Sequence, residues 1–224
     1  MGDWQFFIDE LFDYWPQILD GLLNTLWLAG FITVSGLLGG VVVFYFALSQ
    51  SRMIRRLTNA YISFFIGTPL IVLLFLMYYG LPQWGLRLSP FVVAAIGFTM
   101  NVAAYNARYL MTAYNGLDQS ELEAARAQGF GTLQVFRLIT LPQTLRLAIP
   151  GLTNQAILNL KDSSVAFLIQ YTEFFAQVQE LATRSFEYFK AYAAAGLVYL
   201  AMVSVLVLAA RWLERRFMLP GVRR

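Results

Sequence analysis

The chain contains neither cysteine nor histidine among its 224 residues. The lack of cysteine excludes disulfides, thiolate nucleophiles and cysteine-based metal sites, and it leaves the redox compartment undecided. Without histidine the chain has no Ser-His-Asp triad and no HExxH zinc motif. It also has no G-x-x-x-x-G-K-[ST] stretch, so any ATP used with this protein has to be bound by another chain.

Charge is scarce as well. Charged residues make up 13% of the chain and hydrophobic residues 58%, whereas soluble domains are about a quarter charged and about half apolar. A soluble domain of this length needs more charge than that to cover its surface. The composition therefore predicts an all-α membrane protein that crosses the bilayer several times.

Five stretches are apolar and long enough to cross a bilayer as helices, which takes about 20 residues each. We expect spans at about 21–48, 60–80, 90–113, 149–171 and 191–212. The fourth span is interrupted by Lys161 and Asp162. In this interpretation residues 21–216 form one transmembrane domain, preceded by an interfacial segment (1–20) and followed by a tail (217–224).

Basic residues are concentrated on one predicted side of the membrane. Ten lie there: Arg52, Arg55, Arg56, Arg126, Arg137, Arg146, Arg215, Arg216, Arg223 and Arg224. Only Arg87, Arg184 and Lys190 lie on the other side. Because cytoplasmic loops carry the excess of Lys and Arg, the N-terminus is predicted outside and the C-terminus in the cytoplasm. Residues 172–190 mix aromatic and polar residues, which favours an amphipathic helix on the outer surface.

The connection over residues 114–147 is too polar to cross the membrane and too long for a tight turn. Asp118 and Ser120 each have a glutamate three residues later, which is the capping-box spacing at a helix start. Gly129 is placed to end that helix in a left-handed conformation. We therefore expect a short helix on this loop, with Leu122, Ala125 and Phe130 facing the protein.

A second short helix is expected on the same loop. Thr132 is suited to cap it, and the pattern continues through Ile139. Pro142 is expected to close it, because proline cannot continue a helix without losing a hydrogen bond.

The spacing in this loop resembles the EAA loop of ABC-type importer permeases. The matching residues are Glu123-Ala124-Ala125, Gly129, Ile139 and Leu141-Pro142. Gly67-Thr68-Pro69-Leu70 and Leu160-Lys161-Asp162-Ser163-Ser164 resemble motifs of the polar amino-acid permeases in that family. The segment from Ile169-Gln170 through Ala191 is most similar to the cystine/cationic amino-acid branch.

The resemblance implies a five-helix permease subunit in a bacterial cytoplasmic (inner) membrane. Its expected partners are a second permease chain, identical or paralogous, two ATP-binding subunits, an extracytoplasmic substrate-binding protein and the amino-acid substrate, with no nucleic acid. No catalytic residue, metal or cofactor is expected on this chain, since the partner ATPase binds ATP and Mg. The residues implied in coupling to the ATPase are Glu123, Ala124, Ala125, Gly129, Leu141 and Pro142.

Polar and charged residues inside the spans are the candidates for a substrate path, because intramembrane charges are costly unless paired or hydrated. The candidates are Thr68, Asn101, Asn106, Arg108, Gln155, Lys161, Asp162, Ser163 and Ser164. The alternative is an internal ion pair with interhelical hydrogen bonds. Lys161 and Asp162 are adjacent and so point about 100° apart on a helix, which argues against a simple mutual pair.

One motif departs from the family pattern. Relatives read A-Y-x-x-E-x-x-R, whereas here Arg108 replaces the acid and Met111 replaces the arginine. Two hypotheses follow from this change. Either the substrate is neutral, zwitterionic or acidic and Arg108 holds a carboxylate, or this chain is the non-recognising half of a heterodimer.

Two other classes of protein fit less well. An ion-coupled secondary transporter needs inverted repeats or discontinuous helix pairs, and the five unlike spans show neither. A membrane enzyme needs a nucleophile with a base, or metal ligands.

The GxxxG at Gly36 and Gly40 is interpreted as a site of close helix packing.

Overall fold

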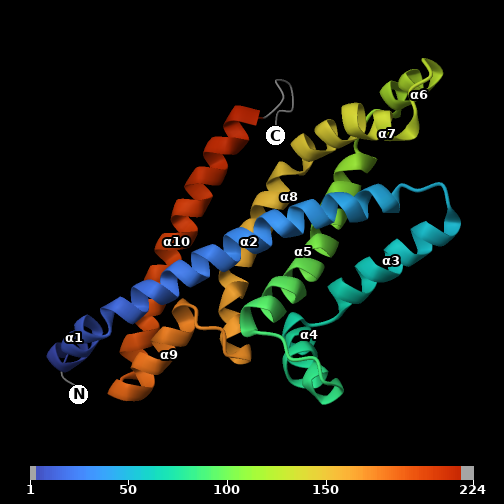
Figure 1. Ribbon diagram of the computed structural model, residues 1–224. Helices are drawn as coiled ribbons and strands as arrows, with labels where there is room; N and C mark the ends of the chain where they lie inside the picture. Colours follow the sequence, from blue (N-terminus) through green and yellow to red (C-terminus); the bar gives the residue numbers. More distant parts are fainter. Residues whose placement is uncertain (1–3, 218–224) are drawn as a thin grey trace.

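The computed structural model describes residues 4–217, with side chains up to Trp212, and every element in that part of the chain is helical (Figure 1). In chain order the elements are α1 (Trp4–Asp13), α2 (Trp15–Ala47), α3 (Arg52–Gly67), α4 (Leu70–Phe75), η1 (Leu76–Gly80), η2 (Leu81–Trp84), α5 (Pro90–Asn115), α6 (Gln119–Ala127), α7 (Thr132–Val135), η3 (Phe136–Thr140), α8 (Leu141–Asp162), η4 (Ser163–Ile169), α9 (Phe174–Ser185) and α10 (Tyr188–Phe217). The predicted all-α fold class is confirmed. Arg223 and Arg224 lie outside the described residues, as do the side chains of Arg215 and Arg216.

Three helices, α2, α5 and α10, are each long and apolar enough to cross a membrane. The pair formed by α3 and the segment Leu70–Trp84 adds a fourth if it counts as one broken span. In the part of the chain described, α8 is not among them, and its sequence contains several side-chain amides besides Arg146, Lys161 and Asp162. The five-span count and the orientation therefore stay predictions.

The segment expected as a single span over 60–80 is sharply bent. The axes of α3 and the following helical segment differ by 99°. The break lies at Thr68, whose φ of −97° and ψ of 126° are extended. The residue before a proline is driven out of the α region by the proline ring, so Pro69 accounts for the break at this position.

The closest helix packing is between α2 and α5 (Figure 1). A Cβ at Gly36 would lie 2.5 Å from Cγ1 of Val102, and a Cβ at Gly40 would lie 2.6 Å from Cβ of Asn106. Only glycine permits this approach. The predicted packing role of the GxxxG pair is confirmed, and the neighbouring core contains Phe98.

The expected end of the second loop helix at Pro142 is wrong, because the chain passes from α7 through η3 into α8 without a break. In η3 the backbone widens into a π-turn, in which the N–H of Leu141 donates to the carbonyl of Phe136. Pro142 follows directly and occupies the first turn of α8. The wide turn accommodates the proline, so the ring does not terminate the helix.

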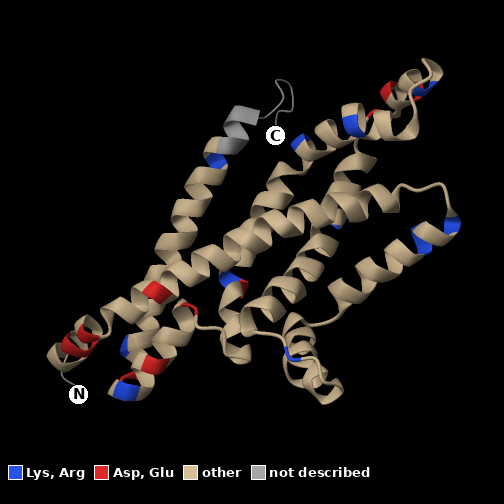
Figure 2. Cartoon of the chain, viewed as in Figure 1, with Lys and Arg blue, Asp and Glu red and all other residues tan. Residues whose placement is uncertain are grey.

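Charged residues are found mainly near the ends of the helices and in their connections (Figure 2). Long uncharged stretches of α2, α5 and α10 run between these charged regions. Acidic residues gather on α1, and most of the basic residues described at the opposite end lie in the first turns of α3 and along α6 to α8. This distribution is typical of helices whose middle parts lie in hydrocarbon.

Candidate coupling loop and membrane path

α6 is a short helix with hydrogen bonds at both ends. The carboxylate of Asp118 accepts the Ser120 N–H at 2.9 Å, and this bond lowers the pKa of the Asp118 carboxyl. At the other end Gly129 has a φ of +87° and donates its N–H to the carbonyl of Arg126 at 3.0 Å. The next N–H reaches one residue further back, which completes a Schellman motif. Of the two predicted starts Asp118 is the N-cap, whereas Ser120 lies inside the helix, and the predicted glycine stop is confirmed.

One face of α6 is anchored to the protein. Leu122 is 1% exposed and Ala125 is also buried, and both pack with Val135 of α7. Tyr114 at the end of α5 and Ile139 of η3 complete this small cluster. The loop over residues 114–147 therefore has its own apolar core, which joins α6 to the helix that leads into α8.

The opposite face of α6 is open to solvent. Glu123 and Ala124 are exposed. Phe130 was expected to face the protein, but it is 39% exposed. The left-handed turn at Gly129 redirects the chain and carries Phe130 off the buried face of the helix.

The motif residues beyond the π-turn lie close to α6. Leu141 and Pro142 are half-buried at the start of α8. The side-chain amide of the neighbouring Gln143 donates to the carboxylate of Glu121 at 2.6 Å. This bond ties the α6 end of the motif to its Leu-Pro end.

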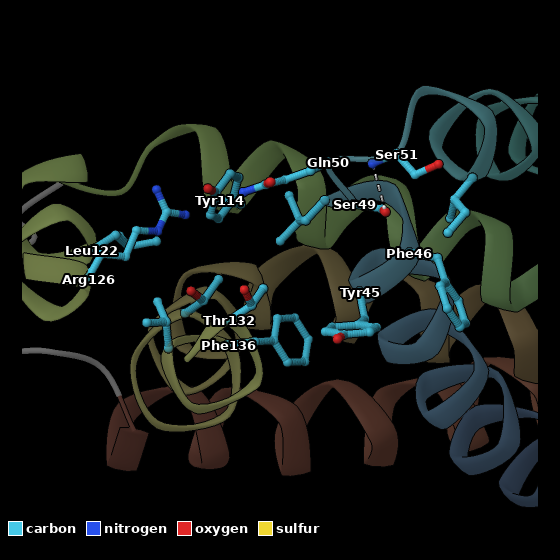
Figure 3. Close-up of a pocket in the computed structure, with 14 residues that line it drawn as sticks. Tyr45, Phe46, Ser49, Gln50, Ser51, Tyr114, Leu122, Arg126, Thr132 and Phe136 are labelled. Carbon is cyan, nitrogen blue, oxygen red and sulfur yellow. Dashed lines mark hydrogen bonds between the residues drawn. The ribbon is translucent and has the colours of Figure 1, made fainter. Parts of the chain in front are cut away.

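A cavity of about 480 Å³ lies between α6 and the connection from α2 to α3. Figure 3 shows Leu122 and Arg126 at one end, Tyr45 and Phe136 along one wall, and Gln50 opposite. Arg126 is its only charged lining residue. The cavity therefore separates α6 from the connection between α2 and α3.

Two of the three asparagines of α5, Asn101 and Asn106, are buried between helices. The Asn101 amide donates to the carbonyl of Phe65 at 2.8 Å, close to the break that follows α3. Asn106 packs against Gly40 of α2, and its side-chain oxygen has no partner among the described residues. Both positions fit helix packing, and their place on a substrate path stays a prediction.

Amides also connect α8 to α2. Gln155 donates to the side-chain oxygen of Asn159 at 2.9 Å, and Asn159 donates to the hydroxyl of Thr33 at 3.1 Å. The side-chain oxygen of Gln155 is buried and without a partner in the described structure. Gln155 thus has one hydrogen bond within α8 and an unused acceptor, and the bond that crosses to α2 is made by Asn159.

The four polar residues of the motif Leu160-Lys161-Asp162-Ser163-Ser164, here called the Lys161 motif, differ in exposure and in hydrogen bonding. Lys161 and Asp162 are both exposed. Neither forms an ion pair with the other or with any other described residue. Ser163 is buried and donates to the carbonyl of Leu160 at 2.8 Å. Ser164 donates to the carbonyl of Lys161, also at 2.8 Å.

A second cavity, of about 330 Å³, lies beside Lys161. Ser164 is the other lining residue from the predicted path. The remaining lining residues come from α9 and α10 and were not predicted from the sequence: Phe175, Tyr192, Ala195, Gly196 and Tyr199. No sequence motif connected them to Lys161, because they lie in elements that follow the motif and reach it only by packing.

Sequence reasoning also missed Glu173, which is completely buried at the start of α9. Its carboxylate accepts the N–H groups of Phe175 and Ala176 at 2.8 and 2.7 Å. It also accepts the hydroxyls of Thr25 at 3.2 Å and Tyr199 at 3.3 Å. Burial raises the pKa of Glu173 to about 7, although the hydrogen bonds work in the opposite direction.

Arg108 and Thr68, the remaining candidates for the substrate path, do not line the cavity beside Lys161. Arg108 is exposed on α5 and makes no ion pair within the described residues, while Met111 is half-buried. Thr68 is half-buried at the break after α3. Among the described residues no group of three or more Asp and Glu side chains is arranged to hold a metal ion.

Comparisons with known proteins cover almost the whole chain. The probable amino-acid ABC transporter permease protein PatM of Vibrio harveyi is 36% identical over 211 residues, which are 93% of this chain and 95% of PatM. The probable amino-acid permease protein YxeN of Bacillus subtilis (strain 168) is 34% identical over 221 residues, which are 97% of both chains. A solved amino acid ABC transporter with histidines has a TM-score of 0.85 at 27% identity, covering 96% of this chain and 99% of that chain.

Residues 36–219 match the family described as the binding-protein-dependent transport system inner membrane component. The matched segment contains the capped helix α6, the Leu141-Pro142 junction and the Lys161 motif. This chain is therefore a member of the binding-protein-dependent transport system inner membrane component family.

Proposed function

We propose that this chain is the permease subunit of an ABC-type importer that moves a polar amino acid across the bacterial cytoplasmic membrane. The observation that carries the proposal is the near full-length likeness to PatM and to the solved amino acid ABC transporter. Both likenesses include the coupling loop and the Lys161 motif, so they extend beyond the shared helical architecture.

The proposed assembly contains ten spans from two permease chains, each with five helices and an outer N-terminus. One chain alone cannot enclose a path with so few helices. Two ATP-binding subunits with ATP and Mg, and an outer substrate-binding protein, complete the importer. Native mass spectrometry of the purified complex tests this assembly. A complex containing a single permease chain that is active in uptake would contradict it.

α6 is the proposed contact with the ATPase. ATP-driven closure has to reach the membrane helices through an element that does not deform. The caps at Asp118 and Gly129 and the buried Leu122 and Ala125 hold α6 in place, while Glu123 and Ala124 remain exposed for contact. The Glu121–Gln143 bond passes motion of α6 on to α8.

The coupling proposal is tested with Glu123→Ala and Gly129→Asp in the reconstituted importer. We expect both variants to insert in the membrane and to abolish transport together with stimulated ATP hydrolysis. An aspartate at a φ of +87° is strained, whereas only glycine adopts this conformation freely. The matched control is Gly131→Asp, because Gly131 has an ordinary φ of −68° at a helix N-cap, where aspartate is favoured. Normal uptake with Glu123→Ala or Gly129→Asp would remove the coupling role.

The proposed path runs along the exposed charges of α5 and α8. Lys161, Asp162 and Arg108 are exposed at positions within the predicted spans. Charged groups facing lipid cost several kcal/mol, so these residues have to face water or a second chain. This requirement supports a hydrated path or a second permease chain next to these residues.

The non-recognising half of a heterodimer is the second candidate function. The observation that favours it is the loss of both members of the family pair at Arg108 and Met111. The test is Arg108→Glu combined with Met111→Arg, assayed for uptake of several labelled amino acids. An altered substrate order supports direct contact by Arg108. Unchanged order and affinity assign recognition to the partner chain and remove Arg108 from the path.

A further inference from the structure

We propose that the cavity beside Lys161 binds a zwitterionic α-amino acid whose side chain is uncharged and apolar or aromatic. The inference rests on the proposed function and names the substrate class that the site accepts. Lys161 binds the α-carboxylate, the oxygens of Ser164 and Tyr199 accept from the α-ammonium, and Phe175 and Tyr192 contact the side chain.

The charge of the cavity favours an anionic group in its ligand. Lys161 is the only charged residue among those lining it, and it makes no ion pair within the described residues. An ammonium at membrane depth is costly without a partner or water. A carboxylate supplies the missing charge, and charge-assisted hydrogen bonds of this kind are about twice as strong as neutral ones.

The two hydroxyl groups in the cavity are acceptors. Tyr199 donates its single proton to Glu173, Ser164 donates to the backbone carbonyl of Lys161, and the two hydroxyl groups are also hydrogen-bonding neighbours of each other. Each oxygen is left with lone pairs and no further hydrogen to give. A cation beside two acceptors is complementary to the carboxylate and ammonium of one amino acid.

Glu173 is a positioning residue, because it accepts the Tyr199 proton and leaves the Tyr199 oxygen as an acceptor. Four donors converge on its carboxylate, namely two backbone N–H groups of α9, the Thr25 hydroxyl and the Tyr199 hydroxyl. With its oxygens used as acceptors, Glu173 directs the Tyr199 proton away from the cavity. Glu173 does not itself line the cavity, so it is not available to pair with a charged side chain of the ligand.

The walls select an uncharged side chain. Phe175 and Tyr192 are stacked with centroids 5.9 Å apart and an angle of 16° between the rings. Tyr192 uses its hydroxyl on Gln179, so its ring is the part that the ligand meets. With no carboxylate in the lining and only one cation, neither a second ammonium nor a second carboxylate on the ligand has a partner. This departs from the cationic substrates implied by the branch resemblance.

Gly196 provides a way to fill the cavity without disturbing the fold. A Cβ at Gly196 would meet nothing within 4 Å, although the residue lines the cavity. Gly30 on α2 has the same open surroundings and lies outside the cavity. Gly196→Leu and Gly30→Leu are therefore a matched pair, which differ in the cavity and not in packing strain.

The test measures dissociation constants for labelled phenylalanine, leucine, lysine and glutamate by equilibrium dialysis against the purified permease–ATPase complex. We expect phenylalanine and leucine to bind at least tenfold more tightly than lysine or glutamate. Gly196→Leu should abolish phenylalanine binding, and Gly30→Leu should leave it unchanged. Lys161→Gln should weaken binding at least tenfold, while Lys161→Arg should retain it within about threefold, because arginine keeps the charge. Tyr199→Phe should weaken it without changing complex assembly.

Equal phenylalanine binding by Gly196→Leu and Gly30→Leu would overturn the inference. So would lysine binding as tight as that of phenylalanine, or no binding of phenylalanine and leucine to the unmodified complex. Failure of the proposed function looks different. In that case the complete importer with its binding protein takes up no amino acid into proteoliposomes, whatever the cavity binds.

Discussion

Asp118 and Glu173 perform the same local task in two very different places. Each is the N-cap of a short helix; Asp118 accepts one backbone N–H from the first turn, and Glu173 accepts two. Asp118 is exposed, and its hydrogen bond lowers its pKa. Glu173 is completely buried, and burial raises its pKa to about 7 in spite of more hydrogen bonds.

The comparison shows that cap chemistry alone does not set the behaviour of a cap. Asp118 bonds to a residue two positions away, so its helix start depends on local sequence. Glu173 also holds Thr25 of α2 and Tyr199 of α10, which join α9 only through packing. The exposed cap therefore defines one helix, and the buried cap fastens three together.

The largest effect is expected from Glu173→Ala. Removing the carboxylate leaves several buried donors without an acceptor, each costing about 1–3 kcal/mol, so we expect a loss of about 3 kcal/mol or more in the free energy of unfolding. Denaturant unfolding of the detergent-solubilised protein measures it. The control is Glu180→Ala, which removes a surface ion pair with Arg184 and should change stability by less than about 1 kcal/mol. Equal losses in the two variants would contradict the role of Glu173 as a fastener.

A smaller change in the stability of the folded protein is expected when the pH is varied. Because the pKa of Glu173 rises from 4.5 to about 7 on folding, the folded state binds more protons than the unfolded state between these values. The contribution of Glu173 is therefore fully present below about pH 4.5, falls as pH rises, and is lost above about pH 7. Thermal unfolding from pH 4.5 to 8 should show this decline in stability. In Glu173→Gln the part of the pH dependence that comes from Glu173 should be absent. A variant with the same slope as the unmodified protein would show that Glu173 does not titrate in this range.

The smallest effect on global stability is expected from Asp118→Ala. Its exposed carboxylate caps α6 alone, so the loss should appear as faster amide hydrogen exchange in residues 119–127 with little change in the melting temperature. Asp118→Asn should retain slow exchange, because asparagine is an equally good N-cap. Exchange in α6 that is unchanged by Asp118→Ala would show that packing of Leu122 and Ala125 alone holds the helix.

Some features were predictable because their causes are local. The caps of α6, the left-handed Gly129 and the small-residue contact at Gly36 and Gly40 each follow from residue types a few positions apart. The continuation of the helix past Pro142 was not predictable in the same way. It depends on the π-turn at Phe136–Thr140, which changes the backbone geometry just before the proline.

The sequence by itself determined the membrane character, the helical class, the coupling-loop motif and the family, because composition, apolar run length and motif spacing are written along the chain. Only the tertiary structure decided that Glu173, Thr25 and Tyr199 meet, and that Tyr199 and Gly196 line a cavity with Lys161. Thr25 and Glu173 are 148 residues apart. Neither carries a local signal of the other, since their contact exists only where α2, α9 and α10 pack together.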